Sequence, residues 1–293
     1  MAYPKLAGPR PRLLVLESQY WIDRACARAA GRLGWEIAQI PTRMEGVLPR
    51  ELVARLVETL AEFRPDFVLT VNLSGMDERG LFAGLFEDLG IPLVAWFVDD
   101  PRTILLDRDR YGSPLSIALV WERAYVPYLR ARKFGAVHWM PLAADLDLFD
   151  GEPGETWDRP PTFVGNSMVE SALQELAWIQ ERPVLHEMVC HAFREGRVTR
   201  AHFGRGLGAM LGEDAVVHLD EHERRHAELY CFVEGTRRLR ESTVAALVQE
   251  GLWVHGDTHW TAVTSQSLPY VRYETDLATH YRRCLVNLNI TSL

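Results

Sequence analysis

The amino-acid sequence predicts an α/β protein built from two Rossmann-like domains. Short apolar runs alternate with stretches of helical periodicity through the first half of the chain. A stretch rich in Pro, Gly and acids, Asp150–Pro161, follows, and strand-like runs then resume. Strands separated by helices are typical of a mostly parallel sheet with helices on both faces. The 293 residues leave room for two domains of about 150 residues each.

The first domain is expected over residues 1–150. Leu52, Leu56 and Leu60 recur on one face of a predicted helix, and Gly34 and Gly90 follow other helices as C′ glycines often do. The predicted strands are Arg12–Glu17, Trp35–Thr42, Phe67–Val71, Leu93–Val98, Ile117–Trp121 and Val137–Leu142. The predicted helices are Tyr20–Leu33, Pro49–Phe63, Glu78–Leu89 and Tyr125–Phe134.

The second domain is expected over residues 162–293, after a linker at 151–161. It opens with a strand, Thr162–Val164, and a helical insertion occupies about 169–250. The insertion's periodic stretches are Ser171–Ile179, Pro183–Phe193 and Glu221–Gln249, with Gly204, Gly206 and Gly208 interrupting them. Strand, loop and helix signals then resume over Leu252–His255, Tyr270–Tyr273, Asp276–Cys284 and Leu285–Ile290. A doubly wound domain normally continues further, so this domain looks incomplete.

Composition excludes several classes of protein. The formal net charge of -8 disfavours a nucleic-acid partner, because such proteins usually carry a basic excess. The four cysteines form no CxxC pair, which disfavours structural zinc and a disulfide framework and favours a reducing compartment. No apolar run approaches membrane-spanning length, and the N-terminus lacks a signal-peptide core. We therefore expect a cytoplasmic protein with no membrane span.

Candidate ligand-binding residues follow the predicted strands, because ligands of open parallel sheets bind beyond the strands' carboxyl ends. In the first domain, the expected substrate-binding residues are Tyr20, Asn72, Ser74, Arg102 and Glu122.

The sharpest cluster in the first domain is Asp99-Asp100-Pro101-Arg102. Either aspartate is a candidate general base for a hydroxyl nucleophile, with Arg102 orienting an anion. The structural alternative is an acidic N-cap with Pro101 at N1 and a local Asp–Arg ion pair. Adjacent residues of an extended strand point to opposite faces, which disfavours a metal site here.

In the second domain, Gly165-Asn166-Ser167 directly follows a predicted strand and precedes a helix. Glycine lets the backbone approach a phosphate, and a helix N-terminus favours its charge. The alternative is that Ser167 is only an N-cap. Gly256 and Asp257 follow the next strand and are candidates for the same edge of the sheet.

Metal and nucleophile motifs are weak. His218, Glu221, His222 and His226 are close enough in sequence to form a metal site, but the run Asp220–Glu228 is charged almost throughout and is typical of a solvated helix face. His186-Glu187 lacks the second histidine of HExxH, and no Ser or Cys lies in a GxSxG context.

Several segments together resemble the CgeB-like glycosyltransferases, a family named for a spore-maturation protein that includes flagellin-modifying enzymes. The order of the motifs carries the resemblance, which spans most of the chain outside the helical stretch. The segments are Tyr20-Trp21, Phe67–Leu69, Trp96–Arg102, Met140–Ala143 before Asp145, Phe163–Asn166 and Leu285–Ser292.

The resemblance implies a GT-B fold and metal-independent, hexosyltransferase-type transfer from a UDP-, GDP-, CMP- or dTDP-linked sugar, with no cofactor required. The acceptor would be a protein such as flagellin, or a glycan, with Asp99 or Asp100 as base. The implied donor-binding residues are Gly165, Asn166, Ser167, Gly256, Asp257, Tyr273 and Glu274. Family members continue past the Asn289–Ser292 segment with further donor-binding residues, so we expect an incomplete donor site in this polypeptide.

Two other interpretations remain open from the sequence. One is a non-catalytic binding or scaffold module on the same fold, since a fold does not fix a function. The other is a different nucleotide-sugar enzyme, such as a non-hydrolysing epimerase.

Overall fold

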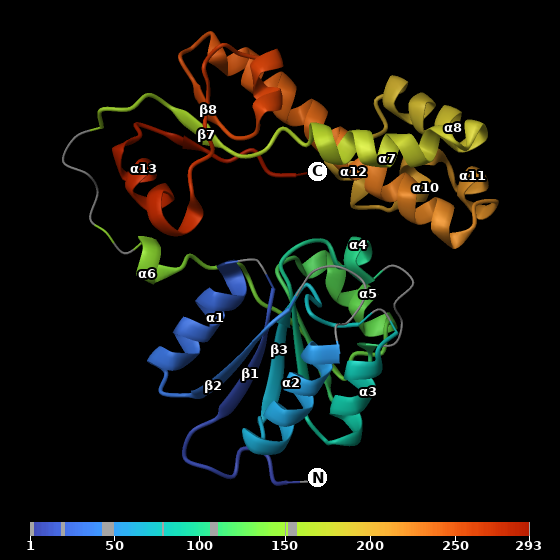
Figure 1. Ribbon diagram of the computed structural model, residues 1–293. Coiled ribbons are helices and arrows are strands. Elements are labelled where there is room, and N and C mark those ends of the chain that lie inside the picture. The colour runs from blue at the N-terminus through green and yellow to red at the C-terminus, as the bar shows by residue number, and fades with distance from the viewer. Residues whose placement is uncertain are drawn as a thin grey trace. The chain divides into compact units, whose positions relative to one another are not determined.

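The computed structural model describes residues 3–18, 21–42, 50–77, 79–105, 111–149, 151 and 157–292. They form an α/β protein with two parallel sheets (Figure 1). The chain divides into two compact units, Met1–Asp145 and Leu146–Leu293. The predicted α/β class is therefore confirmed.

The first unit is built on a six-stranded parallel sheet in the order β2-β1-β3-β4-β5-β6. This is the flavodoxin-like order and differs from the 3-2-1-4-5-6 order of dinucleotide-binding Rossmann domains. Its topological switch point lies between β1 and β3, where ligands of such sheets bind. The strands are β1 Arg12–Glu17, β2 Glu36–Pro41, β3 Phe67–Val71, β4 Leu93–Phe97, β5 Ser116–Val120 and β6 Ala136–Trp139.

Helices cover both faces of this sheet. Leu14 and Leu16 of β1 pack in the core shared with α2, α3 and α5, whereas Leu13 and Val15 pack with Ala27 of α1 on the other face. This alternation follows from the period of two along a strand. The helices of the unit are α1 Trp21–Arg32, α2 Arg50–Glu62, α3 Leu81–Asp88, α4 Pro101–Leu105, η2 Arg123–Tyr125 and α5 Val126–Ala131.

The second unit begins with α6, Leu146–Phe149, and contains a four-stranded parallel sheet in the order β10-β7-β8-β9. In chain order, β9 is the third strand of this four-stranded sheet, and it ends just before the expected Tyr270–Tyr273 segment. Pro269 follows β9 and has no N–H to continue the ladder, and Tyr273–Leu277 is a π-helix (η4) leading into α13. The remaining elements are β7 Thr162–Val164, β8 Trp253–His255, η3 Thr258–Ala262, β9 Ser267–Leu268, α13 Ala278–Arg283 and β10 Asn287–Leu288.

The helical segment between β7 and β8 has a hydrophobic core of its own, which includes Leu185, Val189 and Met210. Its last helix, α12, begins with a capping box between Asp220 and Glu223 and reaches the core under the sheet. Its helices are α7 Val169–Gln180, α8 Pro183–Arg194, α9 Arg200–Phe203, α10 Leu207–Leu211, α11 Glu213–Val217 and α12 Glu221–Val248. Among the residues described, none of the helices has the length and apolar character needed to cross a bilayer.

The end of the predicted linker is already part of the second unit. Arg159 forms a parallel bridge with Cys284, and Asp158 forms an ion pair with Arg283. Residues 152–156 of the linker lie outside the described residues.

Candidate functional site

At the carboxyl edge of the first sheet, Asn72 joins the end of β3 to the end of β4. Its Oδ1 accepts hydrogen bonds from the amides of Val98 (2.9 Å) and Asp99 (3.3 Å), and its Nδ2 donates to Asp99 Oδ2 at 2.7 Å. Asn72 and Leu73 both have left-handed backbones, with φ of 51° and 56°. Such a conformation is uncommon for leucine, so two strand ends are held together by a strained turn.

Asp99 follows the end of β4, bonded to this turn, with its side chain exposed to solvent. The pKa of its carboxyl is nevertheless raised, because nearby protein atoms partly dehydrate it; the hydrogen bond from Asn72 lowers the pKa and the charge of Asp100 raises it. Within the described chain, Asp99 Oδ1 accepts no hydrogen bond. An exposed carboxylate that is fixed through one oxygen and open at the other has the geometry of a general base.

Asp100 is instead buried and bonded within the chain. Its carboxylate accepts from Arg102 Nε at 3.0 Å, from Arg102 Nη2 at 2.6 Å and from the Arg102 amide at 2.9 Å. Pro101 begins α4, as the structural alternative for this motif expected. The Arg102 guanidinium also lies over the Tyr125 ring, 5.3 Å from its centre. Asp100 and Arg102 thus stabilise the turn that presents Asp99.

Two other predicted residues of this edge, Ser74 and Glu122, lie in or beside turns. The Ser74 carbonyl accepts from Thr70 Oγ1 at 2.7 Å. Glu122 follows β5 in an extended conformation and begins the η2 turn, where its carbonyl accepts from the Tyr125 amide at 3.2 Å. Tyr20 lies outside the described residues.

Asp23 is a residue of this edge that the sequence interpretation missed. It lies in the first turn of α1 with no exposed surface, and its Oδ2 accepts from the Ser18 amide at 2.7 Å and from the Ser18 hydroxyl. Burial raises the pKa of Asp23, whereas the bonds from Ser18 lower it. The only signal in the sequence was an acid soon after a strand, which is also the signal of an ordinary first-turn acid.

In the second unit, Gly165 and Gly256 pack against each other at the ends of β7 and β8. The Gly165 amide donates to the His255 carbonyl, and the Gly165 carbonyl accepts from Trp260 Nε1, each at 2.9 Å. A Cβ on Gly256 would lie 2.2 Å from the Gly165 oxygen, and one on Gly165 would lie 2.7 Å from the Phe163 ring. Internal packing by itself therefore explains both glycines.

The backbone amide of Ser167, which the sequence interpretation assigned to a phosphate, donates instead to a carboxylate of the chain. The Ser167 amide donates to Asp257 Oδ2 at 2.6 Å, while Asp257 Oδ1 accepts from the His259 amide at 3.0 Å. Ser167 Oγ accepts from the Val169 amide at 3.2 Å, at the start of α7. Gly165, Ser167, Gly256 and Asp257 are thus brought together, with Asp257 bonded inside the group.

Arg240 of α12 is a second residue that the sequence interpretation missed. Its Nη1 donates to the carbonyl and to the side-chain Oδ1 of Asn166, at 2.9 and 2.7 Å. Burial lowers the pKa of Arg240, and the charge of Asp257 raises it.

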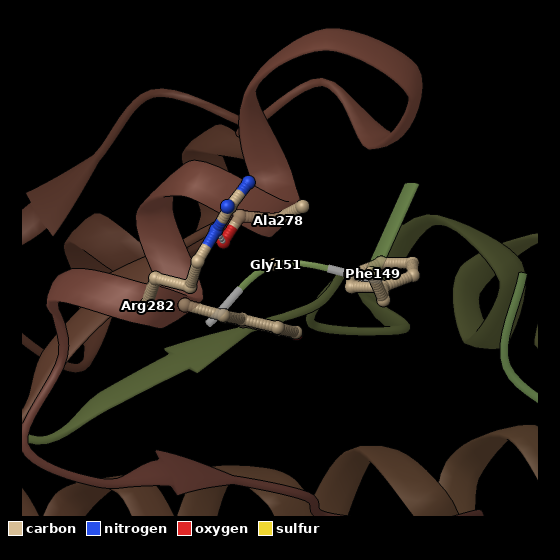
Figure 2. A pocket seen from close by; sticks show the side chains of 5 residues that line it. Phe149, Gly151, Ala278 and Arg282 are labelled. Atoms are coloured by element: carbon tan, nitrogen blue, oxygen red, sulfur yellow. Dashed lines mark hydrogen bonds between the residues drawn. The ribbon is translucent and has the colours of Figure 1, made fainter. Parts of the chain in front are cut away.

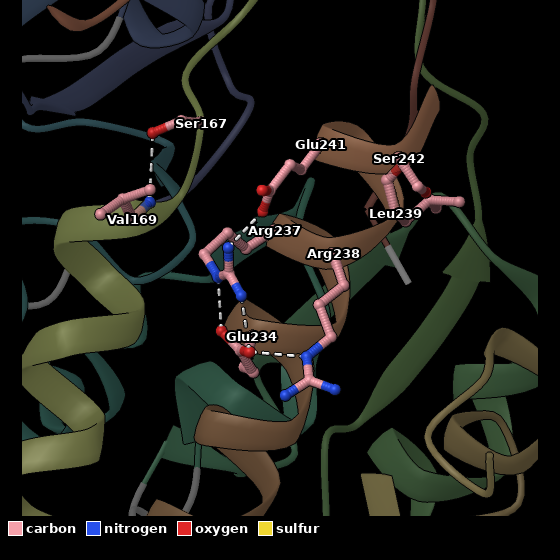
Figure 3. Close-up of polar contacts among 8 residues, drawn as sticks. All are labelled: Ser167, Val169, Glu234, Arg237, Arg238, Leu239, Glu241 and Ser242. Carbon is pink, nitrogen blue, oxygen red and sulfur yellow. Dashed lines mark hydrogen bonds and ion pairs between the residues drawn. The ribbon is translucent and has the colours of Figure 1, made fainter. Parts of the chain in front are cut away.

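The neighbouring arginines of α12, Arg237 and Arg238, form ion pairs with acidic side chains of the same helix. Figure 3 shows buried Glu234 accepting from Arg237 at 2.6 and 2.9 Å and from Arg238 at 2.6 Å. Burial opposes ionisation of Glu234, but these hydrogen bonds hold its pKa below the ordinary value. Arg240 differs from them because its Nη1 donates to the uncharged oxygens of Asn166.

Tyr273 and Glu274, the remaining predicted donor-binding residues, lie in the first turn of the π-helix. The Tyr273 ring packs edge-on against Phe149 at 5.8 Å. Phe149 in turn lines a small pocket with Gly151, Ala278, Tyr281 and Arg282 (Figure 2). The side chain of Arg282 extends along this pocket from α13.

The histidines of α12 pack with α7. The Nδ1 atom of His226 lies 2.7 Å from Glu175 Oε2, and its ring stacks on Trp178 with 3.8 Å between centroids. The His222 ring lies 4.7 Å from that of His226. Across the part of the chain that the structure describes, no three His, Cys, Asp or Glu residues are grouped to hold a metal ion.

Comparison of the chain with protein-family models, with curated proteins and with solved structures gave no match. The fold and the sites thus define a parallel α/β protein in which each of two sheets has polar groups at its carboxyl edge.

Proposed function

We propose that this chain is a metal-independent glycosyltransferase of GT-B type. It would transfer a sugar, hexosyl in type, from a nucleotide-sugar to a hydroxyl group of a protein such as flagellin, or of a glycan, in the cytoplasm. The proposal is supported by two α/β units, each with its own parallel sheet. The free cysteines at positions 26, 190, 231 and 284 fit a reducing compartment.

The arrangement of Asp99 is the observation that carries this proposal. Its carboxylate is exposed, held through Oδ2 by Asn72, and has a raised pKa, which are the properties of a base that takes a proton from an alcohol. In the proposed reaction, Asp99 takes the proton of the acceptor hydroxyl as its oxygen bonds to the anomeric carbon. The bond from that carbon to the phosphate oxygen of the donor breaks, and the nucleoside phosphate leaves with the bonding electrons, as a diphosphate from UDP-, GDP- or dTDP-sugars and as a monophosphate from CMP-sugars.

Transfer assays with a panel of UDP-, GDP-, CMP- and dTDP-sugars, together with calorimetry, test the proposal. Asp99→Asn is expected to slow transfer by about 10²–10⁴-fold, the usual contribution of a general base, and to leave donor affinity unchanged. Asp88→Asn, at an exposed acid on the last turn of α3, is the matched control and should retain full activity. If the wild-type chain binds none of these donors, the proposal is wrong.

A non-catalytic binding module is the second candidate function. It is favoured by the internal bonding of two predicted site groups, the Asp100 carboxylate and the Ser167 amide. Under this alternative, Asp99→Asn would leave cellular glycosylation unchanged. Transfer activity of the purified chain that depends on Asp99 would exclude it.

A further inference from the structure

Two arginines of the helical segment reach the carboxyl edge of the second sheet. Arg240 of α12 donates to both oxygens of Asn166, directly beyond β7. Arg200, the first residue of α9, donates from Nη1 to Thr291 Oγ1 at 3.4 Å, three residues after the end of β10. The two arginines are forty residues apart in sequence, so tertiary folding brings both to this edge.

The two contacts lie beyond neighbouring strands, because β10 pairs with β7. Asn287 is in register with Thr162, and Leu288 with Phe163. Asn166 and Thr291 each lie three residues beyond the paired positions Phe163 and Leu288. The two arginines therefore bond to segments that follow neighbouring strands of the sheet.

The charge of this pair is not cancelled by an ion pair. In the described part of the chain, neither Arg200 nor Arg240 has a carboxylate oxygen within salt-bridge distance, in contrast to Arg237 and Arg238 on the same helix (Figure 3). The Nε atom of Arg240 is buried and has no acceptor among the described residues. Asp257 acts on Arg240 only through space, because both of its carboxylate oxygens bond to backbone amides.

We propose that Arg200 and Arg240 form a binding site for a diphosphate group, with one guanidinium contributed at the end of each strand. A guanidinium donates two parallel hydrogen bonds to phosphate oxygens, and charge-assisted bonds of this kind are stronger than the present bonds to the uncharged oxygens of Asn166 and Thr291. The site therefore exchanges weak internal acceptors for a dianionic ligand. That the diphosphate belongs to a nucleotide-sugar rests on the proposed function; the anion site itself does not.

This assignment gives the helical segment a role in binding. Its core fixes α9 and α12, and α12 continues into the core beneath the sheet through Val244. The segment thereby places the guanidinium groups of Arg200 and Arg240 beyond the ends of β10 and β7. The loop after β8 contributes a negative charge there, that of Asp257.

Calorimetric titration of the full chain with inorganic pyrophosphate, and then with UDP and GDP, tests this site. Arg200→Gln and Arg240→Gln are each expected to weaken pyrophosphate binding about tenfold or more, the loss that follows from removing a charge-assisted hydrogen bond. Arg240→Lys, which keeps the charge without the fork, should bind more weakly than wild type and more tightly than Arg240→Gln. Arg205→Gln, at an exposed arginine of the same segment, is the control and should bind as wild type. Circular dichroism checks that each variant is folded.

The outcomes separate this inference from the proposed function. If wild type binds pyrophosphate and folded Arg200→Gln and Arg240→Gln bind it equally well, the arginine site is wrong and the transferase proposal stands. If the variants lose pyrophosphate but wild type neither binds nor turns over any nucleotide-sugar, the anion site stands and the transferase proposal is wrong. If wild type binds neither pyrophosphate nor a nucleoside diphosphate, both are wrong.

Discussion

Replacing Gly256 with alanine distinguishes a glycine needed for packing from one that serves a ligand. The added Cβ would lie 2.2 Å from the carbonyl oxygen of Gly165 and 2.8–2.9 Å from the Trp260 ring. Neither neighbour moves easily, because one is backbone and the other is a fully buried ring in the core with Phe163. The same displacement would lengthen the 2.9 Å hydrogen bond from Trp260 to Gly165.

The size of the effect follows from these two contributions. Overpacking a core costs about 1–3 kcal/mol, and a lost intramolecular hydrogen bond costs about 0.5–1.5 kcal/mol. Gly256→Ala is therefore expected to lower the free energy of unfolding of the second unit by about 1.5–4.5 kcal/mol. Urea denaturation followed by circular dichroism measures the total. Amide hydrogen exchange around Trp260 shows whether the loss is in this unit, because a chain of two units can unfold in more than one transition.

Gly204→Ala is the matched control in the same unit. Gly204 has an ordinary helical backbone, with φ of -60°, and a Cβ there would lie 3.4 Å from its nearest neighbour, an ordinary contact. Its effect should stay within about 0.5 kcal/mol. The packing argument is refuted if Gly256→Ala is as stable as wild type. If that stable variant also fails to bind pyrophosphate, Gly256 acts on the ligand.

Three further predictions concern buried acids, buried bases and thiols. Asp66→Ala should destabilise the first unit by about 1.5–3 kcal/mol, because this buried carboxylate accepts from two backbone amides and from the Arg12 guanidinium. Burial alone would raise the pKa of Asp66, but these bonds hold it below its ordinary value. The stabilisation that the Asp66 carboxylate gives to the folded state is thus full above its unfolded pKa of about 3.9 and is lost as pH falls through its folded pKa. An acid titration in which Asp66→Asn loses stability as steeply as wild type would contradict this. Burial, with nearby cationic groups, lowers the pKa of His280 to about 4, so stability should decline from pH 6.5 towards pH 4, and His280→Gln should flatten that decline in pH-dependent urea unfolding. Iodoacetamide should alkylate Cys190 fastest, since it is partly exposed and lies 3.4 Å from a histidine nitrogen, whereas burial raises the pKa of Cys26 to about 12; equal labelling rates by peptide mass spectrometry would refute this.

The internal bonding of Asp100 shows what local sequence reveals about a site. Asp-Pro-Arg is compatible with a catalytic acid or with a helix start, and the ion pair between Asp100 and Arg102 spans only two residues. The sequence therefore posed both alternatives, but only coordinates show that Asp100 bonds to Arg102 while Asp99 bonds to Asn72, 27 residues away.

The order of the strands in the first sheet could not be predicted from the sequence either, because it also depends on contacts between distant segments. Alternating strands and helices predict a parallel sheet, because each strand needs a crossover helix to reach the next. The alternation is the same for the 3-2-1 and the 2-1-3 orders. Which strand neighbours β1 depends on how helices such as α1 and α2 distribute over the two faces, and so on packing between distant segments.

The sequence by itself determined the α/β class, most of the helices and strands, and Asp99 at a strand end, since periodicity and turn residues act over short distances. Tertiary structure alone decided that Arg240 meets Asn166, 74 residues away, and that Asp257 occupies the Ser167 amide, 90 residues away. No local pattern encodes these pairings, because they arise only when the parallel strands align and their carboxyl ends share one edge.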